Sequence, residues 1–114
     1  MAAAAAKQTL GHLEFLLIVA ILRLGDDAYG VPIARELDRA GGRLLSRAAI
    51  HVTLQRLEEH GLVRSALSAP RDERGGKPRR YYSVRPEGLA FARRSKDLYT
   101  RLWRGVDALK VPAR

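Results

Sequence analysis

Apolar residues recur at helical spacing in two stretches of the chain before residue 45. The first stretch begins after Thr9, which can serve as an N-cap, and stops at Gly25. Its inward positions are expected to be Leu10, Leu13, Leu17, Ala20, Ile21 and Leu24. The second stretch opens at Tyr29-Gly30 and ends at Gly41-Gly42, and it carries Pro32 in its first turn, where a missing N–H costs nothing. The pattern therefore predicts two helices joined by a short turn.

A third helix is predicted from Ser46, a favourable N-cap, to about His60. Ile50, Leu54 and Leu57 follow one another at spacings of four and three and form its inward stripe. Gly61 is the expected C-cap residue, and Leu62 supplies the hydrophobic contact that often follows such a cap. The second and third helices, with their short connection, have the arrangement of a helix-turn-helix.

The pattern changes from helical to strand-like after Gly61. Residues 63–67 and 80–84 predict two short strands, with Val63 and Leu67 on one side of the first, and the loop between them is rich in Gly, Pro and Arg. Pro86 starts a last helix that is expected to continue to about Lys110. The fold class is therefore mostly α with a small β-hairpin, a winged helix-turn-helix plus a long C-terminal helix. We expect a disordered tail over 1–8, the DNA-binding domain over 9–85 and a dimerisation helix over 86–110.

The charge of the chain narrows the choice of partner. The 114 residues include 21 Lys and Arg, 17 of them Arg, against 12 Asp and Glu, which gives a net charge of +9. Such a balance indicates a polyanion, either nucleic acid or an anionic membrane surface. The longest apolar run, residues 15–22, is far shorter than the roughly 20 residues of a membrane span. The positive charge is not confined to one amphipathic face, so binding to a membrane surface is not expected either. The absence of cysteine excludes disulfides and thiolate zinc sites and fits a cytoplasmic location.

The outward side of the third helix is the first candidate DNA-binding surface. Its candidate residues are Ser46, Arg47, Ala48, His51, Val52 and Gln55. In helix-turn-helix proteins the N-terminal residues of the second helix of the pair meet base edges in the major groove. Arg47 suits guanine or phosphate, Gln55 suits adenine, and Ser46 with its neighbouring amides suits phosphate. The pattern alone is equally compatible with the surface helix of a plain helical domain.

The predicted hairpin carries the second candidate surface. Residues 71–85 contain six basic and two acidic side chains, and Gly75-Gly76 lets the backbone turn tightly. We expect DNA contacts from Arg74, Lys77, Arg79 and Arg80. A solvated charged loop is the alternative. The position of this run between two strands, directly after a candidate recognition helix, favours DNA contact.

Three segments together resemble the PadR family of bacterial transcription regulators. They are AYGVPIARELDRAGG, AIHVTLQRLEEHGLVRS and RGGKPRRYYSVRPEG, which carry the Tyr-Gly, Leu-x-Arg-Leu-Glu-x-x-Gly-Leu and Gly-Gly…Arg-Tyr-Tyr hallmarks in order. The chain departs from the family where many members have Gly-x-Ile-Tyr-Pro, since it has Ala48-Ala49-Ile50-His51-Val52 there. It also has Arg85 where a Thr is common before the last helix. The resemblance implies a sequence-specific regulator that binds DNA.

The expected last helix is too long to pack only on its own domain. Over 86–110 it would span about 37 Å at about 1.5 Å per residue, against a radius of gyration near 13 Å for a compact domain. The candidate dimer contacts are Leu98, Leu102, Trp103, Val106 and Leu109. The resemblance implies a two-fold dimer formed by this helix and the first helix. It also implies a second role for Trp103, as the wall of an inter-subunit pore for a small hydrophobic effector; a stripe that packs on its own domain is the simpler alternative.

The sequence contains no arrangement that supports an enzyme. His12, His51 and His60 lie far apart, no nucleophile–base pair or phosphate-binding loop can be recognised, and neither metal nor cofactor is expected. We therefore predict a transcriptional regulator, a repressor that binds a palindromic operator as a homodimer. A basic winged-helix module that binds RNA or a ribosomal partner is the alternative. It needs exposed aromatic side chains, whereas one of Tyr81 and Tyr82 should be buried.

Overall fold

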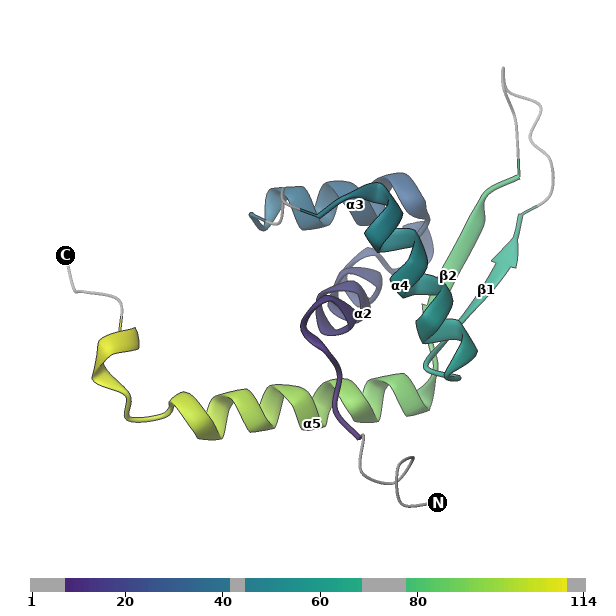
Figure 1. The fold of residues 1–114 in the computed structure, drawn as a ribbon. Coiled ribbons are helices and arrows are strands. Elements are labelled where there is room, and N and C mark those ends of the chain that lie inside the picture. The colour runs from purple at the N-terminus through teal and green to yellow at the C-terminus, as the bar shows by residue number, and fades with distance from the viewer. Residues whose placement is uncertain (1–7, 42–44, 69–77, 111–114) are drawn as a thin grey trace.

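The computed structural model describes residues 8–41, 45–68 and 78–110. In chain order the elements are α2 (His12–Leu24), η1 (Gly25–Asp27), α3 (Gly30–Arg39), α4 (Arg47–Glu59), β1 (Val63–Leu67), β2 (Arg80–Val84), α5 (Pro86–Trp103) and η2 (Asp107–Leu109) (Figure 1). Three helices, a hairpin and a last helix are the predicted order. The fold class predicted from the sequence is therefore confirmed. The expected disordered tail lies outside the described residues except for Gln8, and so does the hairpin segment 69–77, which includes Arg74 and Lys77.

The first helix begins later than predicted, at His12 and not directly after Thr9. Gly11 is the N-cap residue, and its N–H donates to Oε1 of the buried Glu14 at 2.7 Å. The N–H of Leu10 donates to Oγ of Ser95 in α5 at 2.8 Å. Leu10 is thus held outside the helix by a partner 85 residues away, which explains why the nearer capping candidate is not used.

The predicted N-cap of the third helix is confirmed, whereas the C-cap residue is His60 and the predicted Gly61 follows it by one position. Oγ of Ser46 accepts a hydrogen bond from the N–H of Ala49 at 3.0 Å. At the other end, Gly61 has a φ of +74°, and the N–H of Leu62 donates to the carbonyl of Leu57 at 2.9 Å. This is the backbone pattern that lets a glycine close a helix and direct the chain into a strand.

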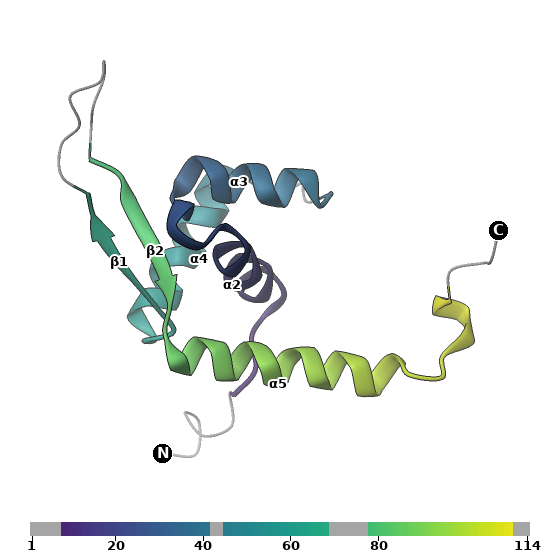
Figure 2. The same ribbon diagram turned by 180° about the vertical axis from the view of Figure 1, so that it is seen from behind.

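The core lies where α2, α3, α4 and the start of β1 meet, and Figures 1 and 2 show α2 at the centre of this arrangement. The most completely buried apolar side chains are Leu17, Ile18, Ile33, Leu57 and Val63. They come from all four elements, and they include positions that the helical spacing had placed inward. The burial of Ile50, Leu54 and Leu57 turns the opposite side of α4 toward solvent.

The hairpin is antiparallel, with Val63 opposite Val84 and Leu67 opposite Arg80. The N–H of Tyr82 donates to the carbonyl of Ala28 at 2.8 Å, on the edge of β2 that β1 does not use. This bond fastens the hairpin to the turn before α3. We call this hairpin, β1 and β2 with the segment between them, the wing. Val63 is buried while Leu67 is 59% exposed, because β1 extends away from the core along the wing.

The last helix ends at Trp103, so the expected continuation to Lys110 is wrong. Gly105 adopts a φ of +80°, and the N–H of Val106 donates to the carbonyl of Trp103 at 3.0 Å. Glycine reaches this left-handed conformation without steric cost, and it ends the helix. The 18 residues of α5 therefore span about 27 Å and not about 37 Å.

The buried residues of α5 are small. They are Gly88, Ala92 and Ser95, while the larger Phe91 packs partly buried against the core. In both views the C-terminal half of α5 extends away from the other helices (Figures 1 and 2). The radius of gyration of 16.4 Å exceeds the roughly 13 Å of a compact domain of this length for the same reason.

Candidate nucleic-acid interface

The outward side of α4 has the exposure that the sequence predicted. The exposed candidates are Ser46, Arg47, Ala48, His51, Val52 and Gln55. The first turns of this helix therefore present Arg47 and Gln55, two long polar side chains that can hydrogen-bond. They also present Ala48 and Val52, two small apolar side chains that can contact a thymine methyl group. This is the chemical mixture that reads base edges in a major groove.

A cleft of about 770 Å³ lies beside this side of α4, between the start of α3 and the first residues of β2. Its lining residues are Tyr29, Gly30, Val31, Arg35, Arg47, Ile50, His51, Leu54, Pro78, Arg79, Arg80 and Tyr82. We call this the basic cleft, because its lining includes four arginines and one histidine but no Asp or Glu. A concave surface with only positive charges attracts a polyanion.

Arg35 is a basic-cleft residue that the sequence reading missed. It lies on the exposed side of α3, opposite the buried Ile33, Ala34 and Leu37. Helical spacing alone could have placed it outward. Its position beside α4 depends on how the two helices cross, which no local pattern contains.

The two described wing arginines have partners within the chain. The Arg79 guanidinium lies over the Tyr29 ring, with Cζ 4.3 Å from the ring centroid. Nη1 of Arg80 donates to Oγ of Ser65 at 2.8 Å, and this hydroxyl lies 2.8 and 2.9 Å from the carboxylate oxygens of Glu58. The sequence predicted both arginines as candidates, but it did not predict Tyr29 and Ser65 as their partners, because these residues are distant from the arginines in the sequence. The start of β2 is thus connected both to the start of α3 and, through Ser65, to the end of α4.

The two wing tyrosines are not free platforms for bases. Tyr82 is 7% exposed, as expected for one of the pair, and burial raises the pKa of its hydroxyl. The Tyr81 ring packs on the Tyr29 ring with centroids 5.3 Å apart. Stacking of single-stranded bases, which the RNA-binding alternative needs, has no exposed aromatic pair on this strand.

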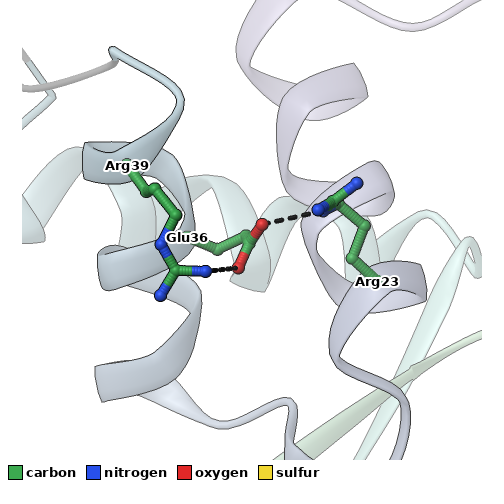
Figure 3. A network of polar contacts seen from close by, with 3 residues as sticks. All are labelled: Arg23, Glu36 and Arg39. Carbon is green, nitrogen blue, oxygen red and sulfur yellow. Dashed lines mark hydrogen bonds and ion pairs between the residues drawn. The ribbon is translucent and has the colours of Figure 1, made fainter.

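Two ion pairs on Glu36 of α3 form a network that reaches Arg23 of α2 (Figure 3). Nε of Arg23 lies 2.7 Å from Oε2 of Glu36, and Nη1 of Arg39 lies 3.4 Å from Oε1 of the same carboxylate. The Glu36 side chain is only 13% exposed, whereas both arginines are largely exposed. Only the Arg23–Glu36 pair joins the two helices, and exposed pairs of this kind contribute little free energy, of the order of 0–1 kcal/mol.

The candidate dimer residues are mostly exposed in the single chain. The exposed fractions are 70% for Leu102, 50% for Trp103, 41% for Val106 and 61% for Leu109, while Leu98 is half-buried. The helix end at Trp103 places Val106 and Leu109 after α5, so they do not continue a helical stripe. The Tyr99 ring packs edge-on against Phe15 of α2 at 5.6 Å. The apolar surface therefore continues from α5 onto α2, where Leu16 and Val19 line a groove of about 420 Å³.

No helix of the described residues is long and apolar enough to cross a membrane. Within those same residues, no group of three or more His, Asp or Glu side chains could hold a metal ion. The three-helix body, the hairpin and the basic cleft together define a winged helix-turn-helix protein.

The chain belongs to the transcriptional regulator PadR-like family, whose pattern matches residues 18–94. It is therefore a transcriptional regulator of a DNA-binding, generally non-enzymatic family. No curated protein matches the chain.

Solved structures agree with this assignment. A PadR family regulator from Eggerthella lenta is 27% identical, with a TM-score of 0.68 over 95% of this chain and 89% of that one. A PadR family regulator from Clostridium difficile is 25% identical, with a TM-score of 0.64 over 87% of this chain and 94% of that one. A PadR-like regulator from Bacillus cereus, 22% identical with a TM-score of 0.66 over 85% of this chain and 88% of that one, shares the fold.

Proposed function

We propose that this chain is a cytoplasmic repressor that binds a palindromic operator as a homodimer. The observation that carries the proposal is the basic cleft, in which four guanidinium groups and no carboxylate lie beside the exposed N-terminal half of α4. A DNA backbone in the cleft would bring the base edges of the adjacent major groove to α4. A dimer that occupies promoter DNA in this way excludes the polymerase.

The two parts of the surface have different roles in this proposal. Arg47, Ala48, His51, Val52 and Gln55 read base edges, and Ser46 with the first amides of α4 holds a phosphate. The contacts to the DNA backbone come from Arg35, Arg74, Lys77, Arg79 and Arg80, of which Arg74 and Lys77 lie outside the described residues. Backbone contacts set the register of the protein on the duplex, and the base contacts supply specificity.

The proposed dimer interface consists of Leu98, Leu102, Trp103, Val106 and Leu109 together with the exposed apolar side of α2. Four of these five side chains are exposed in the single chain, and large apolar side chains that gather on one surface are typical of an interface. One recognition helix reads only a few base pairs. Two-fold pairing doubles this reading and places two copies of α4 about 34–36 Å apart, one turn of DNA.

Trp103 has a second proposed role in this interface, as a wall of a pore for a small hydrophobic effector. Its side chain is half-exposed and lies at the end of α5, between Leu102 and Val106. An effector that stacks on Trp103 from both subunits would change how the two α4 helices are spaced. Quenching of the fluorescence of this only tryptophan of the chain by added apolar compounds would report such binding.

A selection from randomised 30-base-pair duplexes tests the proposal. We expect an enriched motif with two inverted half-sites one turn apart. The chain should shift a duplex with this motif in a gel, and neither double-stranded nor single-stranded RNA should displace the duplex except weakly. A reporter gene with this motif across its promoter should be less active when the chain is present. Equal competition by RNA would favour the RNA-binding alternative, and a more active reporter would make the chain an activator.

A further inference from the structure

The ring of Tyr29 is packed between two side chains of the wing. Tyr29 is the N-cap residue of α3, and its ring contacts Tyr81 at 5.3 Å between centroids and the Arg79 guanidinium at 4.3 Å. Side chains two residues apart lie on the same side of an extended strand, so Arg79 and Tyr81 reach the ring together. The backbone holds this contact in register, since the N–H of Tyr82 donates to the carbonyl of Ala28, the residue before Tyr29, at 2.8 Å.

Arg79 directly precedes β2 in the chain and is held in the hairpin by two hydrogen bonds. Its carbonyl accepts from the N–H of Ser68 at 2.8 Å, and its N–H donates to Oγ of Ser68 at 3.0 Å. The backbone of Arg79 is thus fixed, while its long side chain has several rotatable bonds. A contact with an aromatic face restricts those bonds before any ligand arrives.

A guanidinium stacked on a ring keeps its hydrogen-bonding edge free. The contact uses the flat face of the group, and the five N–H donors point outward in its plane. Tyr29 and Arg79 both line the basic cleft. The hydrogen-bonding edge of the Arg79 guanidinium therefore lies where a phosphate of the proposed duplex would pass. An ordered guanidinium loses less conformational entropy on binding than a freely rotating one.

We propose that Tyr29 is a positioning residue for DNA binding, whose ring orients the Arg79 guanidinium toward a backbone phosphate in the basic cleft. The inference rests on the proposed function. It assigns Tyr29 no direct contact with DNA, and it distinguishes Arg79 from Arg80, whose guanidinium is held by Ser65 and not by the ring.

The test measures the affinity of the full chain for a 30-base-pair duplex of random sequence by fluorescence anisotropy over a series of NaCl concentrations. Tyr29→Leu should weaken binding by about two- to fivefold per half-site, the range expected for an exposed cation–π contact. The slope of log affinity against log salt should stay unchanged, because no phosphate contact is removed. Arg79→Ala should reduce that slope by about 0.9 per half-site. Tyr29→Phe, which keeps the ring, should bind as the wild type does.

A double-mutant cycle separates the proposed role from a merely structural one. Tyr29→Leu should have little further effect in the Arg79→Ala background but its full effect in the Arg80→Ala background. If Tyr29→Leu fails to fold, Arg79→Lys replaces it. This variant keeps the charge but lacks the flat, forked group, so its binding should fall by a similar factor at an unchanged slope.

Three results would overturn the inference. Tyr29→Phe could lose as much affinity as Tyr29→Leu, which would assign the effect to the hydroxyl. The effects of Tyr29→Leu and Arg79→Ala could add fully, or Arg79→Lys could bind as the wild type does. A wild-type chain that binds no duplex would contradict the proposed function itself, whereas each of these results leaves DNA binding in place.

Discussion

Gly88 lies so close to the carbonyl oxygen of Leu62 that a β-carbon on the glycine would overlap it. The same carbonyl accepts a hydrogen bond from the N–H of Arg85 at 3.0 Å. Leu62 follows the end of α4, and Gly88 is in the first turn of α5. These two contacts bring the first turn of α5 against the residues that follow α4.

Gly88→Ala should destabilise the protein by about 1–3 kcal/mol, the usual cost of forcing extra atoms into a packed region. The neighbours of the new methyl group would be backbone atoms of Leu62 and Cγ1 of Val84, and backbone cannot move aside as a flexible side chain can. Urea denaturation followed by circular dichroism measures the change. Gly30→Ala is the matched control, since nothing lies within 4 Å of a β-carbon there, and it should be neutral or slightly stabilising. Equal stability of the two variants would contradict the close contact.

Arg47→Ala and Gln55→Ala should each reduce the preference for the selected operator over random DNA. The expected loss is about 1–3 kcal/mol for each bidentate base contact. Both side chains are exposed, so the free energy of unfolding should change by no more than about 0.5 kcal/mol. Arg93→Ala, an exposed arginine of α5, is the control and should leave the preference unchanged. If both α4 variants keep the wild-type preference, another element reads the bases.

Two substitutions at Ser46 separate its capping role from its proposed phosphate contact. Ser46→Ala removes the acceptor for the N–H of Ala49 and should cost about 0.5–2 kcal/mol of stability. Ser46→Asp keeps a good cap, but its carboxylate would repel a phosphate at the helix N-terminus. This variant should be as stable as the wild type and bind DNA more weakly. Wild-type affinity of Ser46→Asp would show that no phosphate lies at this position.

Leu102→Asp should convert the proposed dimer to a folded monomer. Leu102 is 70% exposed in the single chain, so the aspartate has no desolvation cost within one copy. In an apolar seam between two copies the same carboxylate would lose its water, at a cost of several kcal/mol. Sedimentation velocity at several concentrations measures the assembly, and operator binding should be lost with it.

Leu67→Asp is the matched control for assembly, because Leu67 is 59% exposed on β1. This variant should remain a dimer. A Leu102→Asp chain that stays dimeric would place the interface elsewhere, and a wild-type chain that is monomeric at all concentrations would exclude the two-fold arrangement.

Tyr82, whose side chain is largely buried, should make stability depend on pH in the alkaline range. Burial raises the pKa of its hydroxyl in the folded state above its ordinary value of about 10. The neutral form is favoured by folding, so its contribution is fully present below about pH 10 and is lost as the pH rises toward the folded-state pKa. Tyr82→Phe should lose less stability than the wild type between pH 9 and pH 11 in denaturation experiments. Parallel losses in the two proteins would assign the effect to other groups.

The sequence by itself determined the order of the elements, the outward side of α4 and the pairing of the two strands. The first two features depend on residues within about four positions of one another, and the pairing follows because two strands that succeed one another along the chain form a hairpin. Ser46 caps the amide of Ala49, and Gly61 closes the helix that starts there. Signals of this range can be read before the fold is known. Gly105 is also a local signal, since its position predicts a helix end. The spacing of the apolar residues Val106 and Leu109 nevertheless favoured a helix that continues past it, and this prediction was wrong.

Only the tertiary structure decided the start of α2, the inner face of α5 and the partners of the wing arginines. Leu10 is held by Ser95, 85 residues away, and Gly88 is packed against a carbonyl of another element. Arg79 meets Tyr29 only because β2 is bonded to Ala28. Each of these contacts joins residues that are distant in sequence, so its geometry depends on how whole helices and strands cross and not on the local preferences of the residues involved.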